Sequence, residues 1–140
     1  MRKNEIIVRF CIWDFDDISH ETITEHIGVS PIRIYVKGER MNEKLPQVAK
    51  RNGWLYESPL GKYACFEDQM NSILDILESK TEILNPLCER YYCEFSCALF
   101  IYNNEESTPW VHLNSRYNSL IKRLNIEFDF DIYCHQELIE

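Results

Sequence analysis

The sequence predicts an α+β fold, a mostly antiparallel sheet with helices on one of its faces. Two observations lead to this prediction. The 140 residues are 45% hydrophobic and 27% charged, the composition of an ordinary globular protein of one domain, 1–140. Along the chain, apolar runs rich in β-branched and aromatic residues are interleaved with segments whose apolar residues recur every three or four positions.

The first three elements are a strand, a helix and a second strand. Residues 5–13, "EIIVRFCIW", are typical of a buried strand. Ser19 is a good N-cap for a helix that Gly28 ends in the left-handed conformation. Residues 31–36, "PIRIYV", then place alternate apolar side chains on one face, as a strand does.

The middle of the chain is predicted to hold a long loop, a short strand and a helical region. Residues 37–52, "KGERMNEKLPQVAKRN", show no period and indicate a loop with at most one helical turn. Residues 53–58 are the third strand. From Phe66 onward the apolar spacing is helical, and Pro86 predicts either a kinked helix or two helices end to end.

The last part adds a central strand at 91–102, a short returning strand at 109–113, and a helix capped by Asn114 or Ser115. A final strand closes the chain. The first six elements match the split βαβ arrangement of ferredoxin-like folds. We therefore expect a ferredoxin-like core that is extended by a further βαβ-type unit.

The final strand, "NIEFDFDIYC", alternates apolar and acidic side chains. One interpretation is that Glu127, Asp129 and Asp131 face water while the apolar side packs beneath helices. The other is that the acids join Asp14 and Asp16 around a hard cation. We favour the first, because a sheet with one wet face produces the same alternation and no loop has a calcium-binding pattern. No metal ligand is predicted.

The charge is −8 overall and unevenly distributed. Residues 32–62 carry seven basic and three acidic residues, or +4, which leaves −12 for the remainder. The overall sign disfavours nucleic acid and anionic membranes as partners. The chain has no apolar stretch typical of a membrane span or signal peptide. We therefore expect a cytoplasmic protein whose six cysteines are reduced.

No catalytic constellation is evident. His20 and His26 lie six residues apart, on nearly opposite sides of a helix. Cys134 and His135 are neighbours in a strand and point to opposite faces, so they cannot act as a pair. Phosphate-binding glycine loops and hydrolase motifs are missing from the sequence. The sequence predicts no catalytic residue and no cofactor.

The basic segment offers a candidate binding surface, in which basic residues alternate with aromatic ones. Its members are Arg33, Tyr35, Lys37, Arg40, Trp54 and Tyr56. Aromatic and arginine side chains are enriched at interaction hot spots, so this surface could dock an acidic partner or a small anion. The alternative is a solvated loop whose charges contribute little, with the aromatic residues in the core.

Several landmarks occur together in a definite order. They are "DFDDISHETITEHIGVSP" after the first strand, "VKGER" after the second, "GW" at 53–54, and "DIYC" in the last strand. In this pattern the chain resembles a bacterial family catalogued as domain of unknown function 4279. The resemblance covers most of the chain except 39–52. It implies a compact bacterial cytoplasmic domain with no assigned catalytic residue.

Three functional hypotheses remain. The first is a non-enzymatic protein-interaction module with an unidentified protein partner, for example an immunity protein that blocks a toxin from neighbouring bacteria. The second is a small-anion-binding sensor or enzyme with its site near the basic segment 33–54. The third is a homodimer that pairs through an exposed strand.

Overall fold

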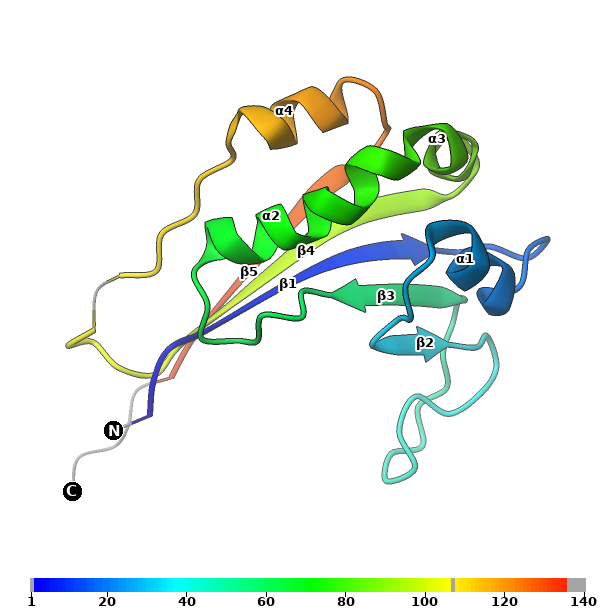
Figure 1. The fold of residues 1–140 in the computed structure, drawn as a ribbon. Coiled ribbons are helices and arrows are strands. Elements are labelled where there is room, and N and C mark those ends of the chain that lie inside the picture. Colours follow the sequence, from blue (N-terminus) through cyan, green and yellow to red (C-terminus); the bar gives the residue numbers. More distant parts are fainter. Residues whose placement is uncertain (1, 107, 136–140) are drawn as a thin grey trace.

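The computed structural model describes residues 2–106 and 108–135, which form a five-stranded sheet covered by helices on one face (Figure 1). The strands are β1 (Glu5–Trp13), β2 (Arg33–Tyr35), β3 (Gly53–Glu57), β4 (Tyr92–Ile101) and β5 (Glu127–Cys134). The helices are α1 (His20–Ile27), α2 (Phe66–Leu77), the 3₁₀ turn η1 (Glu78–Lys80), α3 (Thr81–Arg90) and α4 (Ser115–Ile121).

The strand order across the sheet is β2-β3-β1-β4-β5. All neighbouring strands are antiparallel except β4 and β5, which are parallel. The elements from β1 to β4 thus form the split βαβ arrangement, and the crossover through α4 adds β5 beside β4. The predicted α+β fold, with its ferredoxin-like core and further βαβ-type unit, is confirmed.

Helix ends follow the local signals that the sequence contains. The Ser19 hydroxyl accepts a hydrogen bond from the Thr22 amide, and Gly28 ends α1 with a φ of 84°. Of the two alternatives predicted after Phe66, a kinked helix or two helices end to end, the structure shows the second, with α2 followed by α3. However, the helical axis is interrupted at η1, whereas Pro86 lies inside α3.

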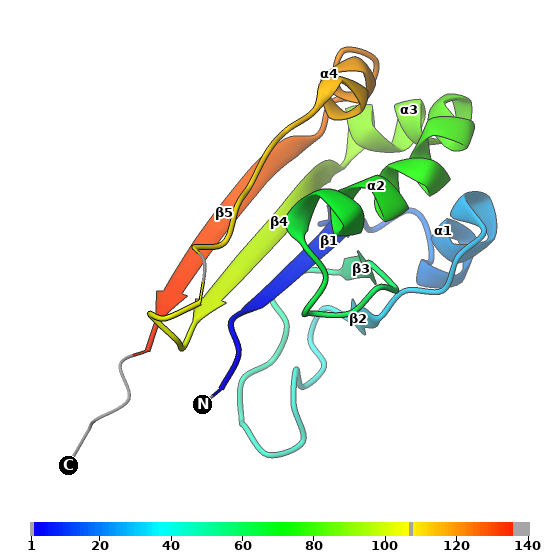
Figure 2. The same ribbon diagram turned by 60° about the vertical axis from the view of Figure 1, so that its left-hand side comes forward.

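The predicted strand at 109–113 is wrong. These residues form an irregular connection on the helix side of the sheet, where Val111 and Leu113 pack against the core (Figures 1 and 2). An extended segment that lies on a core alternates buried and exposed side chains just as a strand does. The pattern at this position therefore reflects packing on a surface and not hydrogen bonding to a neighbouring strand.

The final strand is predicted correctly on its acidic side only. Glu127, Asp129 and Asp131 are exposed to water, as expected. On the other side, Phe128 packs edge-on against the rings of Phe66 and Tyr117, but Phe130 and Ile132 remain exposed. The prediction that this whole side lies beneath helices is therefore wrong. The short helix α4 covers only the beginning of β5 (Figure 2).

Candidate functional site

The structure does not bring the six residues of the predicted binding surface together. Arg33 and Tyr35 of β2 pair with Leu55 and Gly53 of β3. Directly paired residues share a face, so Trp54 points to the opposite, helix-covered face. Its indole is fully buried there and donates a hydrogen bond to the Thr24 hydroxyl.

Tyr56 also lies on the helix-covered face, where it is partly buried against the core. Arg33 and Tyr35 are on the open face, which is the face without helices. Lys37 and Arg40 follow β2, and the Arg40 side chain is exposed. The candidate surface is thus divided between two sides of the sheet, and only its first four residues lie on or next to the open face.

Residues 36–52 form an irregular hairpin, which we call the 36–52 hairpin, and contain no helical turn. The amide of Gly38 donates to the carbonyl of Ala49 at 2.9 Å, and the amide of Met41 donates to the carbonyl of Gln47 at 3.1 Å. Gly38 has a φ of 87°, a conformation that L-residues with a side chain rarely adopt. The hairpin projects from the side of the sheet opposite the helices (Figure 1).

Asn52 fixes the base of the hairpin. Its carbonyl accepts the Asp14 amide at 2.8 Å, and its side-chain oxygen accepts the Lys37 amide at 2.8 Å. Its side-chain amide donates to the carbonyl of Phe15. One residue therefore ties together the end of β1, the end of β2 and the start of β3. This arrangement sets where the hairpin crosses the open face.

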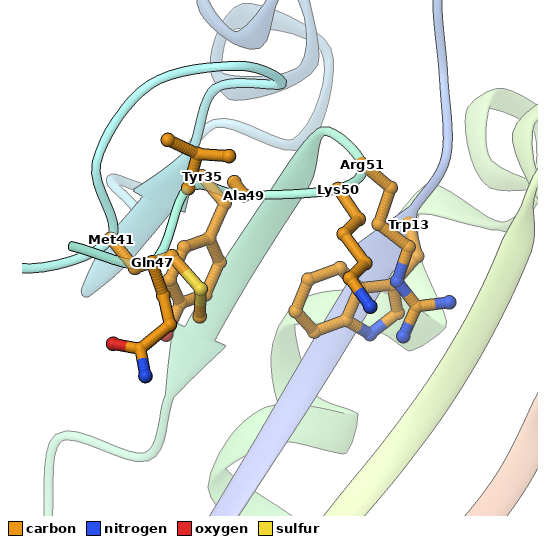
Figure 3. Close-up of a pocket in the computed structure, with 8 residues that line it drawn as sticks. Trp13, Tyr35, Met41, Gln47, Ala49, Lys50 and Arg51 are labelled. Atoms are coloured by element: carbon orange, nitrogen blue, oxygen red, sulfur yellow. The ribbon is translucent and has the colours of Figure 1, made fainter.

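A pocket of about 350 Å³ lies between the hairpin and the ends of β1 and β2 (Figure 3). It is lined by Trp13, Tyr35, Met41, Gln47, Val48, Ala49, Lys50 and Arg51. Small-molecule sites typically start at this size and combine apolar walls with a few polar groups. We call this the hairpin pocket.

Two aromatic rings form the floor of the hairpin pocket. The rings of Trp13 and Tyr35 stack with 5.7 Å between their centroids and 19° between their planes. Both pair in register with Gly53, which lies between them in the sheet. A Cβ atom on Gly53 would come within 2.5 Å of the Trp13 ring and 3.2 Å of the Tyr35 ring. Only glycine therefore leaves room for both rings at this position of the strand.

A buried carboxylate orients the tryptophan. The Trp13 indole N–H donates to Glu94 Oε1 at 3.0 Å, and the Tyr92 hydroxyl donates to Glu94 Oε2 at 3.0 Å. Burial raises the pKa of Tyr92, and its hydrogen bonds to Glu127 and Glu94 raise this pKa further. Tyr92 therefore remains a proton donor to this carboxylate at physiological pH.

Cationic groups lie on the aromatic faces. The Arg51 guanidinium is 4.4 Å from the Trp13 ring centroid, and the Arg33 guanidinium is 4.8 Å from that of Tyr35. Arg33 also donates to the carbonyl of Met41, which holds the hairpin against β2. Lys50 and Arg51 lie together on the Trp13 side of the pocket, whereas Met41 lies on the Tyr35 side (Figure 3). Of the residues that line the pocket, the two cations Lys50 and Arg51 thus lie at one end and Met41 lies at the other.

Trp13 and Arg51 were absent from the predicted surface. From the sequence, Trp13 was expected only to lie in a strand, and Arg51 only to contribute to the charge of the basic segment. The sequence did contain a signal for Trp13. Residues 9 and 13 lie on the same face of a strand, and the charged residue Arg9 indicates that this face is exposed to solvent.

The open face also carries a cysteine, but not a reactive one. Cys11 is buried, and desolvation together with the charge of Glu94 raises its pKa to about 12. Its thiol is therefore protonated at neutral pH. Within the described part of the chain, no group of three or more His, Cys, Asp or Glu side chains is placed to hold a metal ion. The chemistry available at the hairpin pocket is stacking and charge attraction.

Comparison with known families gives one match. A model described as "Domain of unknown function (DUF4279)" matches residues 4–135. The chain belongs to this family. No curated protein and no solved structure matches the chain. Two of the landmarks that suggested the DUF4279 family lie near this pocket: Gly38 is in the hairpin, and Gly53 lies against the rings of Trp13 and Tyr35. Among the described residues of this DUF4279 domain, none of the helices is long and apolar enough to cross a membrane.

Proposed function

We propose that this DUF4279 domain is a non-enzymatic binding module, and that its hairpin pocket holds a small organic anion with a flat, apolar body. The observation that carries this proposal is the stacked pair Trp13 and Tyr35 beside the cations Lys50 and Arg51. A flat ligand gains contact with the aromatic rings and with Met41. Its anionic group is attracted by Lys50 and Arg51.

The pocket composition argues for both parts of this ligand. An inorganic anion alone would make no apolar contact with Met41, Val48 and Ala49, which line the pocket. A neutral aromatic molecule would offer Lys50 and Arg51 no anionic group. A ligand that satisfies both ends uses each wall of the pocket, and the volume of about 350 Å³ limits it to a small molecule.

The test is a calorimetric titration with an aromatic carboxylate, its neutral amide, and inorganic phosphate. We expect the carboxylate to bind at least about tenfold more tightly than either of the others, which corresponds to one charge-assisted contact. The Arg51→Gln variant should lose this preference. The matched control is Arg123→Gln, which removes an exposed arginine after α4, on the helix side of the sheet.

Equal binding of the carboxylate and its amide would contradict the proposal, as would equal losses in the two variants. The absence of binding by aromatic carboxylates of several ring sizes, including bicyclic ones, would also reject it.

A second candidate is a protein-interaction module that uses the same pocket for an acidic segment of a partner. The observation that favours it is the exposure of Met41, Leu45 and Val48 along the hairpin. Clustered exposed apolar residues are typical of interaction surfaces. An immunity-type protein is a different form of interaction module, in which the net charge of −8 attracts a basic toxin.

Leu45 distinguishes the two candidates because it lies on the hairpin but does not line the pocket. A Leu45→Ser variant should bind a small aromatic carboxylate as the unmodified protein does. If the natural ligand is a protein segment, the same variant should weaken binding of acidic peptides that carry one aromatic residue. Loss of both activities would indicate that the hairpin itself had been disturbed.

A further inference from the structure

Strand β5 lies at the edge of the sheet opposite β2, far from the 36–52 hairpin (Figure 2). It is eight residues long and pairs with β4 along one side. No strand of residues 2–106 or 108–135 pairs with its other side. An unpaired edge presents backbone N–H and C=O groups that can pair with another chain. β5 is therefore a template for an added strand.

The side chains of β5 give this edge two different sides. On the open face, Glu127, Asp129 and Asp131 are all exposed. On the helix-covered face, Phe130 is 39% exposed and Ile132 is 57% exposed. A strand added to this edge would place alternate side chains beside the acids and beside the apolar residues.

The acids have little positive charge around them. On the open face, Arg9 of β1 lines a groove together with Asp131, and its guanidinium pairs with Glu57 at 2.9 Å. None of the ion pairs found within the described residues involves Asp129 or Asp131. Beside Asp131, the small side chains of Ser96 and Ala98 leave an open groove of about 270 Å³. This groove has room for a long basic side chain.

We infer that β5 accepts an extended segment of a basic protein partner as a sixth strand, one in which basic and apolar residues alternate. The basic residues lie beside Asp129 and Asp131, and the apolar residues cover Phe130 and Ile132. The net charge of −8 attracts such a partner from a distance. Backbone hydrogen bonds then supply affinity, and the alternation supplies specificity.

A second copy of this chain is a poorer occupant. In a two-fold antiparallel pairing centred on Phe130, Asp129 of one copy would lie opposite Asp131 of the other, and this would occur twice. Like charges directly opposite each other destabilise a strand pair. The predicted homodimer through an exposed strand is therefore disfavoured at this edge, and the acids protect it from self-association.

The probe is an eight-residue peptide of alternating lysine and valine. It is compared with a peptide of four lysines followed by four valines, and with alternating peptides that are N-methylated at every second residue in either frame. We expect the alternating peptide to bind, and the block peptide and at least one methylated peptide to bind at least about tenfold more weakly, because they lose side-chain register or backbone pairing. Amide exchange should slow in β5.

The protein variant that tests the site is Asp129→Lys with Asp131→Lys. Its matched control is Glu21→Lys with Glu25→Lys, which makes the same change in net charge on the exposed side of α1. The first variant should lose binding at least about tenfold at moderate salt, and the control should retain it. If the first variant does not fold, the methylated peptides still test the proposal on the unmodified protein.

Three outcomes would overturn the inference. Binding of both methylated peptides as tightly as the unmethylated alternating peptide would show that only charge matters. Equal losses in the two protein variants would show that the interaction is not located at β5. Light scattering that shows a dimer with slowed amide exchange in β5 would make a second copy the occupant. This inference is independent of the hairpin pocket, because Arg51→Gln should leave binding of the alternating peptide within about twofold of the unmodified protein.

Discussion

The two faces of the sheet are built from alternate residues of the same strands, yet they have different properties. On the helix-covered face, Phe10 of β1 and Phe95 of β4 are fully buried in a continuous apolar core. On the open face, Trp13 and Arg9 of the same strand β1 are partly exposed and make polar and cation–π contacts. One face thus forms the core of the fold, while the other presents aromatic and charged groups to solvent.

The largest expected effect is the difference in stability lost between two substitutions, one on each face of β4. Phe95→Ala removes a fully buried ring that packs against Phe10 and Tyr117, and should cost about 3–5 kcal/mol of unfolding free energy. Phe100→Ala removes a half-buried ring on the open face that stacks on Tyr133, and should cost about 1 kcal/mol. Urea denaturation measures both. Equal costs would mean that the two faces do not differ in this way.

This comparison also shows what the sequence could and could not predict. Within β2 and within β3, the residues that share a face were predicted correctly, because side chains along a strand alternate between its two faces. Parity does not fix the register between strands. The pairing of Tyr35 with Gly53 puts Trp54 on the other face, and no sequence pattern predicts that pairing. The candidate surface therefore joined residues from two faces.

The hairpin was harder to predict for a different reason. Residues 36–52 have no apolar period, and their structure depends on backbone hydrogen bonds such as that between Gly38 and Ala49. Side-chain patterns carry no information about such bonds. The exposure of Phe130 and Ile132 was missed because the length of α4, and so the part of β5 that it covers, is decided by tertiary packing.

The second largest expected effect tests whether side chains are tightly packed at the end of the open face that carries the hairpin pocket. Gly53→Ala places a methyl group within 2.5 Å of the Trp13 ring, so the ring must move. We expect a loss of about 1–3 kcal/mol, the usual cost of overpacking, together with a change in the near-ultraviolet circular dichroism. Both are measured by urea denaturation and spectroscopy of the folded protein.

The control for Gly53→Ala is the same substitution in a Trp13→Leu background. Leucine lacks the ring atoms that the new methyl group would meet, so the additional cost should fall below about 0.5 kcal/mol. A cost that is unchanged in this background would show that the glycine matters for its backbone and not for the aromatic stack.

The smallest expected effect is the pH-dependent stability that Cys11 contributes on the open face. Cys11 is on the open face but is buried, and its pKa is raised from 9.0 to about 12, mainly by desolvation. A pKa raised on folding contributes stability below the unfolded value of 9.0, and this contribution is lost as pH rises toward 12. The Cys11 thiol should therefore account for a loss of about 1 kcal/mol between pH 8 and pH 10.

The measurement is urea denaturation at both pH values for the unmodified protein and for Cys11→Ala. The variant should lose about 1 kcal/mol less than the unmodified protein over this interval, although it is less stable at pH 8. Cys134→Ala, which removes an exposed thiol on β5, is the matched control. Parallel pH profiles for all three proteins would show that water reaches Cys11. Water would then reach the open face as far as Cys11. The tight packing around Trp13 would have to be confined to the hairpin pocket.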